Sequence, residues 1–181
     1  MRLVTSFSDA GYELYGKKFI DTFIKHIDHD LIVYYEKDRE FPVDRKVKYI
    51  YIAEVPHLVE YLSRPKVQQT DKIPGFQYKL FKFCRKSFIQ CYEMLNDSFY
   101  WIDADVVFDD KCPDNFFEDN IKEDALISYM KRKDYHPCTS LVGFNADHKD
   151  IGKFRQEYLN IYLNDEVFNI PEWHDALYST G

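Results

Sequence analysis

The chain has 181 residues, which is enough to bury one sizeable core but short for two independent domains. Its formal net charge of −7 argues against binding nucleic acid or an anionic membrane through overall charge, and its 18% of aromatic residues excludes a disordered chain. No stretch approaches the roughly 20 apolar residues of a membrane helix, and Ser and Asp interrupt the first residues before a signal-peptide core can form. We therefore expect a folded cytoplasmic protein with no transmembrane segment and no nucleic-acid partner.

The first half of the chain alternates strand and helix patterns. Residues 2–7 predict a short strand, and residues 12–27 carry apolar side chains at helical spacing despite Gly16. Residues 30–36 are a near-continuous apolar run, typical of a strand that a parallel sheet buries on both faces. A further strand is predicted at residues 47–55. Strand, helix and strand in this order open an α/β domain.

The second half continues the same alternation. Residues 76–95 predict the clearest helix of the chain, and residues 99–108 predict a strand soon after it. Two more strands and a helix are predicted at residues 124–130, 139–145 and 149–163. No repeat, low-complexity tract or linker divides the chain, so we expect residues 1–181 to form a single α/β domain.

The cysteines indicate a reducing compartment. Cys84, Cys91, Cys112 and Cys138 form neither a CxxC pair nor a zinc-site pattern with histidine. Cys84 and Cys91 would lie two helical turns apart, about 10 Å, which is beyond the Cα separation that a disulfide spans. We expect buried thiols.

Two aspartates, Asp103 and Asp105, follow an apolar run that begins at Phe99. If the strand continues through them, both carboxylates point to the same side and repel each other unless a cation or a shared proton lies between them. Ligands of open α/β sheets bind beyond the carboxyl ends of the strands, and Mg²⁺ or Mn²⁺ takes carboxylate oxygens while leaving positions for phosphate. The alternative is a solvated strand end that runs into an acidic turn with Asp109 and Asp110.

Three stretches resemble glycosyltransferases of the GT-A fold, including phage and bacterial members. "YWIDADVVF" is similar to their DxD motif, "VTSFSDAGYELYGKKFIDTF" to their first strand, loop and helix, and "CTSLVGFN" to the strand that lines the sugar and acceptor side. The resemblance implies a Rossmann-like mixed sheet flanked by helices, a UDP- or GDP-linked sugar donor, Mn²⁺ or Mg²⁺, and an acceptor that it does not identify. It also implies that Asp105 binds the metal directly and that Asp103 assists through the metal, its water or the ribose. Ser6 and Phe7 would then touch the nucleotide.

The segment "EWHDALY" resembles the WHD segment of the blood-group and α-galactosyl type of GT-A transferases. There the acid after the His-Asp pair is assigned a catalytic role, but this chain has Ala176 at that position, which leaves Asp175 and Glu172 as candidate catalytic residues. The resemblance nominates His174 as a third metal ligand, and a hydrogen-bonded histidine beside Trp173 is the alternative. The chain ends soon afterwards, so a compact enzyme and one shortened on the acceptor side both stay open.

Two groups of basic residues could bind anions. Lys79, Lys82, Arg85 and Lys86 form a cationic side of the helix before the DxD motif, where Lys79 is our candidate for the donor diphosphate. Residues 131–133 are a candidate acceptor loop. The alternative for both groups is a solvated surface.

The leading hypothesis is a metal-dependent glycosyltransferase. A phosphohydrolase of the haloacid dehalogenase type is the first alternative, because its nucleophile motif is also an apolar strand followed by DxD, with Asp103 as the nucleophile. In that family the motif normally opens the fold, whereas here fewer than eighty residues follow it. A non-catalytic module that binds a nucleotide-sugar is the second alternative.

Overall fold

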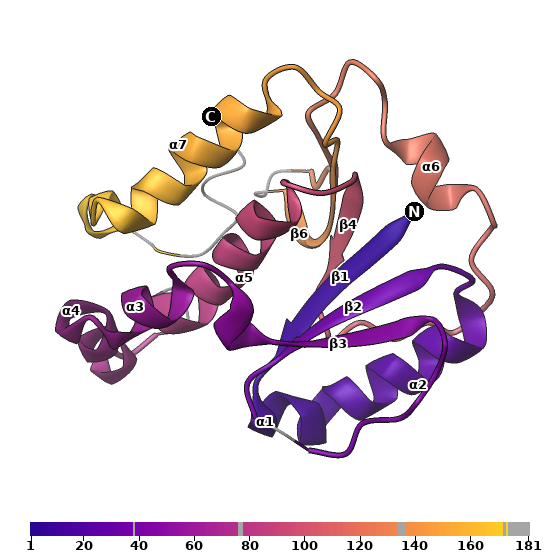
Figure 1. The fold of residues 1–181 in the computed structure, drawn as a ribbon, viewed down its shortest axis with the longest axis horizontal. Helices are drawn as coiled ribbons and strands as arrows, with labels where there is room; N and C mark the ends of the chain where they lie inside the picture. Colours follow the sequence, from indigo (N-terminus) through magenta and orange to yellow (C-terminus); the bar gives the residue numbers. More distant parts are fainter. Residues whose placement is uncertain (38, 76–77, 134–136, 172, 174–181) are drawn as a thin grey trace.

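The computed structural model describes residues 1–37, 39–75, 78–133, 137–171 and 173. Within these residues a mixed sheet has the strand order β3-β2-β1-β4-β6-β5, with helices on both faces (Figure 1). The strands are β1 Arg2–Phe7, β2 Asp30–Tyr35, β3 Val47–Tyr51, β4 Phe99–Ile102, β5 Ile127–Met130 and β6 Cys138–Phe144. This is the α/β architecture with a mixed sheet that the sequence predicts.

The helices form two layers. After β1 come α1 Asp9–Gly11, the π-helical turn η1 Tyr12–Gly16 and α2 Lys17–His26; after β3 come η2 Ile52–Glu54, α3 Leu58–Ser63, α4 Pro65–Gln69, η3 Thr70–Lys72 and α5 Leu80–Glu93. The later helices are α6 Phe116–Asn120, α7 Ile151–Leu163 and η5 Glu166–Asn169. None of the helices in the described ranges is long and apolar enough to cross a membrane. The predicted cytoplasmic location stays a prediction.

The sheet is parallel in its first half and antiparallel in its second. β1 pairs in parallel with β2 and β4, and β2 with β3, whereas β6 runs antiparallel to both β4 and β5. Four consecutive residues of β2, from Leu31 to Tyr34, are buried, which confirms the prediction of a strand covered on both faces.

Side chains alternate between two hydrophobic clusters across the sheet. Leu3, Val33 and Tyr100 pack toward α2, whose buried face is Phe19, Ile20 and Phe23. Their strand neighbours, such as Val4, Tyr34 and Trp101, pack toward α5 and α7 on the other face. Each helix layer therefore approaches the sheet from its own side.

Four predicted elements have wrong bounds, and one of them, the strand predicted at 124–130, begins only at Ile127. The predicted strand at 47–55 ends at Tyr51, and the predicted helix at 76–95 is confirmed only from Leu80 to Glu93. The strand predicted at 99–108 ends at Ile102, because the apolar residues beyond it pack on a helix instead of continuing the ladder: the ring of Phe108 lies 5.8 Å from that of Phe19. The short helices between residues 58 and 72 were not predicted.

All four thiols are free, as predicted, but they are not equally buried. Cys84, Cys91 and Cys138 are buried and Cys112 is only partly so, which corrects that part of the prediction. Burial raises the pKa of both Cys84 and Cys91 to about 12.

We expect Cys84 and Cys91 to resist alkylation in the native protein, because they are neither accessible nor ionised. In a Cys112→Ser, Cys138→Ser variant, iodoacetamide at pH 7.5 should label no thiol until denaturant is added, as read by intact-protein mass spectrometry. Labelling of either cysteine at the rate of the unfolded chain would contradict this packing of α5.

Candidate functional site

The chain reverses its direction across the sheet between β1 and β4. β1 is connected to β2 on one side through α1 and α2, and β4 on the other side is reached through α5, which covers the opposite face. The loops after β1 and β4 therefore part at the carboxyl edge of the sheet, where open α/β sheets bind their ligands. Asp103 and Asp105 lie at this edge.

The DxD residues form a turn. Asp103 donates its N–H to the Ser140 carbonyl on β6 over 2.9 Å, and Val106 donates its N–H to the Asp103 carbonyl over 3.2 Å. Between the aspartates, Ala104 is buried against the α2 side. The prediction that the strand continues through both aspartates is therefore wrong, because β4 ends at Ile102 and a turn begins at Asp103.

Asp103 is held by groups from α5 and β4. Its Oδ1 accepts hydrogen bonds from Lys86 Nζ over 2.9 Å and from Trp101 Nε1 over 2.6 Å. Lys86 is only 8% exposed and also donates to the Thr139 carbonyl over 2.7 Å. For Lys86 the alternative of a solvated helix surface is thus wrong: its charge is buried beside a carboxylate, where a lone ammonium would be costly.

Asp105 is exposed, and within the described residues it forms no hydrogen bond or ion pair. Its negative charge acts on Tyr15, which belongs to the π-helical turn η1 on the α2 side of the sheet. Burial raises the pKa of the Tyr15 phenol, and the negative charges of Asp105 and Asp103 raise it further. A π turn inside a helix is often found at a functional site, and Tyr15 lies in this turn.

A shallow open depression, which we call the cleft, lies at the ends of β1 and β2 and encloses no room for a water molecule. Its lining includes Phe7, Asp9, Tyr12, Tyr35, Arg39 and Phe41. Arg39 donates to Glu13 over 2.7 Å and to Asp9, and its guanidinium lies 4.3 Å from the centre of the Tyr12 ring. Aromatic faces, a guanidinium and a carboxylate are thus gathered beside the DxD edge.

The predicted nucleotide contacts lie at the same edge. Ser6 is partly buried near the end of β1, and Phe7 is buried with its ring 5.2 Å from that of Tyr12. Lys79 lies at the start of α5, where its Nζ donates to the Asp71 carbonyl over 2.5 Å, two helical turns before Lys86. The predicted residues Glu172, His174 and Asp175 lie outside the described residues.

Several residues at this edge were not predicted: Asp9, Tyr15, Glu36 and Arg39. Arg85 pairs with Glu36, with Nε 2.8 Å from Oε1. Burial raises the pKa of Glu36, and the charge of Arg85 opposes that shift. The signal that could have found Asp9 and Glu36 is their place at or just beyond the end of the first two predicted strands, since parallel strands end at one edge.

The donor set at this edge is incomplete for a metal enclosed by protein alone. Within the described residues, no group of three or more His, Cys, Asp or Glu side chains could hold a metal ion. Mg²⁺, however, is commonly bound by one or two carboxylates together with substrate phosphates and water. Asp105 and Oδ2 of Asp103, which accepts no hydrogen bond within the described residues, fit that manner of binding.

Comparison with solved structures identifies the fold. Mouse xyloside xylosyltransferase 1, in its apo form, matches with a TM-score of 0.59 at 10% sequence identity, over 98% of this chain and 79% of that chain. The fold is that of the GT-A glycosyltransferases. The PaToxG glycosyltransferase matches with a TM-score of 0.55 at 11% identity, over 98% of this chain and 68% of that chain. The galactosyltransferase LgtC, in complex with donor and acceptor sugar analogs, matches with a TM-score of 0.53 at 11% identity, over 98% and 69% of the two chains.

No protein-family model matches the sequence, and no curated protein does so either. The three-dimensional likeness confirms the GT-A fold that the DxD resemblance implies. These matches share the fold with this chain but little of its sequence.

Replacing Lys86 should destabilise the protein, because Asp103 would lose its cation and the Thr139 carbonyl its donor. We expect Lys86→Met to lower the free energy of unfolding by about 1–3 kcal/mol in urea denaturation. Lys82→Met, on an exposed position of the same helix, is the control and should change it by less than about 0.5 kcal/mol. Equal effects of the two substitutions would contradict a structural role for the buried contact.

Proposed function

We propose that the chain is a metal-dependent glycosyltransferase that transfers a sugar from a UDP- or GDP-linked donor to an acceptor. The observation that carries this proposal is the position of Asp103 and Asp105: a turn at the carboxyl end of β4, beside the cleft at the ends of β1 and β2, in a chain with the GT-A fold. The nucleotide would lie across the open surface at the ends of β1 and β2, and the DxD turn is where its diphosphate would meet the metal.

The charges at this edge support a need for a metal ion. The cations around the cleft and the DxD turn lie beside acids: Lys37 and Arg39 beside Asp9, Arg39 also beside Glu13, Arg85 beside Glu36, and Lys86 beside Asp103. Asp105 remains without a cation within the described residues. A diphosphate brought to this edge would therefore face carboxylates, and a divalent cation is the simplest group that removes the repulsion.

In this proposal Asp105 and Oδ2 of Asp103 hold Mn²⁺ or Mg²⁺, with His174 as a further ligand. The bound ion would neutralise the charge that develops on the leaving diphosphate. Lys86 and Trp101 keep the Asp103 carboxylate in one orientation, so the ligand is preorganised. The roles of Lys79 at the diphosphate and of Asp175 and Glu172 in catalysis stay predictions.

The two alternatives differ in what they do to a donor. A phosphohydrolase of the dehalogenase type is not favoured, since the matching structures are glycosyltransferases and the DxD follows β4 and not the first strand. A non-catalytic module would bind the same nucleotide-sugar without cleaving it. Slow hydrolysis of the donor therefore separates an enzyme from a module.

Metal-dependent nucleotide binding should raise the melting temperature. A ligand at 100 times its Kd stabilises the native state by about 2.7 kcal/mol, which is a shift of several degrees for a domain of this size. We expect UDP or GDP with Mn²⁺ to produce the shift in differential scanning fluorimetry and EDTA to abolish it. The proposal would be contradicted if no nucleoside diphosphate shifted the transition with Mn²⁺ or with Mg²⁺.

Asp105→Asn should weaken Mn²⁺-dependent binding of the nucleotide by at least about tenfold, because the amide keeps the size of the side chain but removes the charge that holds a hard cation. Asp109→Asn, an exposed aspartate of the same loop, is the matched control and should bind as the parent does. Isothermal titration gives the affinities, and release of UDP or GDP from nucleotide-sugars gives the activity. Turnover of aryl phosphates that depends on Asp103, without any cleavage of nucleotide-sugars, would instead favour the phosphohydrolase.

A further inference from the structure

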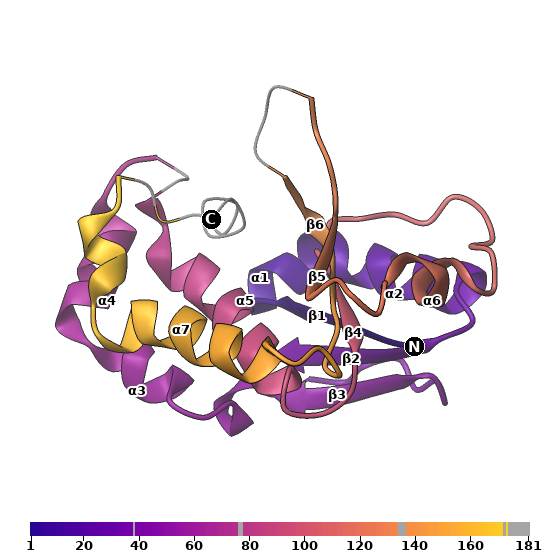
Figure 2. The ribbon, with the colours of Figure 1, turned by 90° about the horizontal axis from the view of Figure 1, so that it is seen from above.

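The basic residues 131–133 extend from the two last strands of the sheet, beside the DxD turn. We call β5, β6 and Lys131–Lys133 the arm. Its pairing register jumps: Tyr129 lies opposite Val142, but the next residue, Met130, lies opposite Cys138. Three residues of β6 therefore bulge out, and the arm turns away from the sheet and projects beyond it (Figure 2).

The bulge is attached directly to the candidate site. Thr139 accepts the hydrogen bond from Lys86 Nζ, and Ser140 accepts the one from the Asp103 N–H. Two of the three bulged residues thus hold the DxD motif and its buried lysine. A bulge in this position redirects a strand next to a site, so whatever the arm carries is presented at the same edge as the DxD turn.

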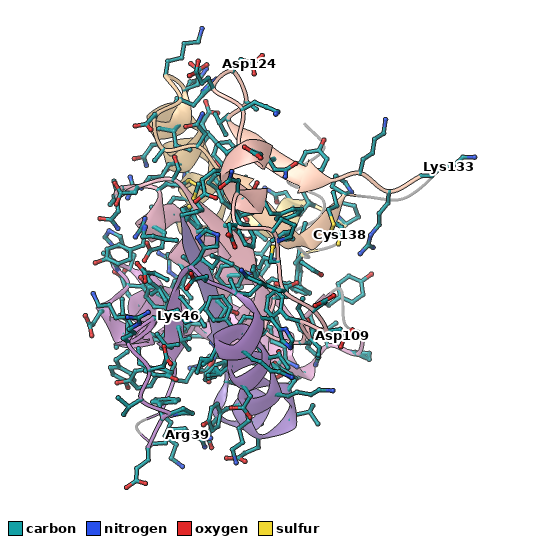
Figure 3. All side chains as sticks on the ribbon, turned by 90° about the vertical axis from the view of Figure 1, so that its right-hand side faces the viewer. Arg39, Lys46, Asp109, Asp124, Lys133 and Cys138 are labelled. Carbon is teal, nitrogen blue, oxygen red and sulfur yellow. The ribbon has the colours of Figure 1, made fainter. Side chains whose placement is uncertain are left out.

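The described residues of the arm carry positive charge that no described acidic side chain offsets. Lys131, Arg132 and Lys133 are exposed, and within the described residues none of them lies within ion-pair distance of a carboxylate. The side chain of Lys133 extends away from the body of the molecule, beyond Cys138 (Figure 3). This is unlike Arg39, Arg85 and Lys86 at the cleft and the DxD turn, which are all matched by acidic side chains.

Arg132 is also held in place. Its Nη2 lies 3.1 Å from Cys138 Sγ, on the first residue of β6. Cys138 precedes Ser140 by two residues, which is about 7 Å along a strand. Arg132 is therefore anchored close to the DxD turn with the rest of its guanidinium open to a ligand. Beside it, Tyr129 and Met130 expose 46% and 49% of their surface, enough for an apolar contact with a sugar ring.

We infer that the arm selects an acceptor saccharide that carries an anionic group, either phosphate or carboxylate. This inference rests on the proposed function and names the acceptor class that it leaves open. An arginine with a fixed position between two lysines is suited to either anion, because its guanidinium can bind two oxygens at once. An anionic acceptor also has less to gain from Arg39, Arg85 and Lys86 at this edge, because each of them lies beside an acid.

The test uses an array of neutral, uronic-acid and phosphorylated oligosaccharides that are otherwise identical, with UDP and Mn²⁺ present. The parent should bind the anionic members at least about tenfold more tightly than their neutral counterparts, and this preference should fall as salt rises from about 50 to about 300 mM. Separate uronic-acid and phosphorylated series show which anion is preferred.

The variant Lys131→Gln, Arg132→Gln, Lys133→Gln should lose the preference. The matched control is Lys25→Gln, Lys48→Gln, Lys149→Gln, which removes the same charge from exposed positions near the amino ends of the parallel strands and should keep it. Melting temperatures check that both variants are folded. A parent without anionic preference, or an arm variant that retains it, overturns the inference.

Two further measurements separate the outcomes. Vesicles that contain phosphatidylserine test a membrane surface as the partner, and arm-dependent binding to them without a preference among the saccharides also overturns the inference. Donor hydrolysis by the parent is measured in the same preparation. Hydrolysis without anionic preference counts against the arm alone, whereas anionic preference without hydrolysis supports the arm as an anion site and counts against the proposed function.

Discussion

The pairing of β1 with β4 at the centre of the sheet is the constraint on which the site depends. Leu3 of β1 lies between Leu31 of β2 and Tyr100 of β4, so the chain must leave the two central strands toward opposite sides. The helices that follow β1 and precede β4 cover opposite faces, and their loops cannot close over the same edge. The crevice at the carboxyl ends is therefore a result of topology, and polar residues can gather there without disturbing the core.

The two aspartates of the DxD motif differ in their surroundings. Asp103 is bound to Lys86 and Trp101 from the α5 side, so its orientation is fixed before any ligand arrives. Asp105 is exposed, and its negative charge raises the pKa of Tyr15 on the α2 side. One carboxylate is thus part of the folded framework, and the other remains available. Burying the Lys86 ammonium would cost free energy, and its hydrogen bonds to Asp103 and to the Thr139 carbonyl offset that cost.

Most elements of the fold could be predicted because their patterns are local. The four buried residues of β2 and the apolar face of α5 follow directly from hydrophobic periodicity. The end of β4 could not be predicted in this way, because Val106, Val107 and Phe108 look like more strand. Only the packing of Phe108 on α2 shows where their apolar surface is buried.

The residues of the candidate site likewise fall into those that a local sequence pattern predicts and those that only the fold brings together. Asp103 and Asp105 are adjacent in sequence and form a recognisable motif, whereas Asp9, Glu36 and Arg39 come from separate loops that only the parallel pairing brings together. Lys86 is the clearest case. Its position in the helix suggests an exposed cation, and no spacing in the sequence predicts that Asp103, seventeen residues later, is its partner.

The distribution of charge connects these features. At the cleft and the DxD turn Arg39, Arg85 and Lys86 each lie beside an acid, which under the proposed function leaves the donor phosphates to a divalent ion. On the arm the cations have no such partners within the described part of the chain, and Arg132 is held at Cys138, two residues before Ser140. Under the two proposals, two anions would be bound at one edge by different means, the donor through an exchangeable metal and the acceptor through positive charge fixed in the chain.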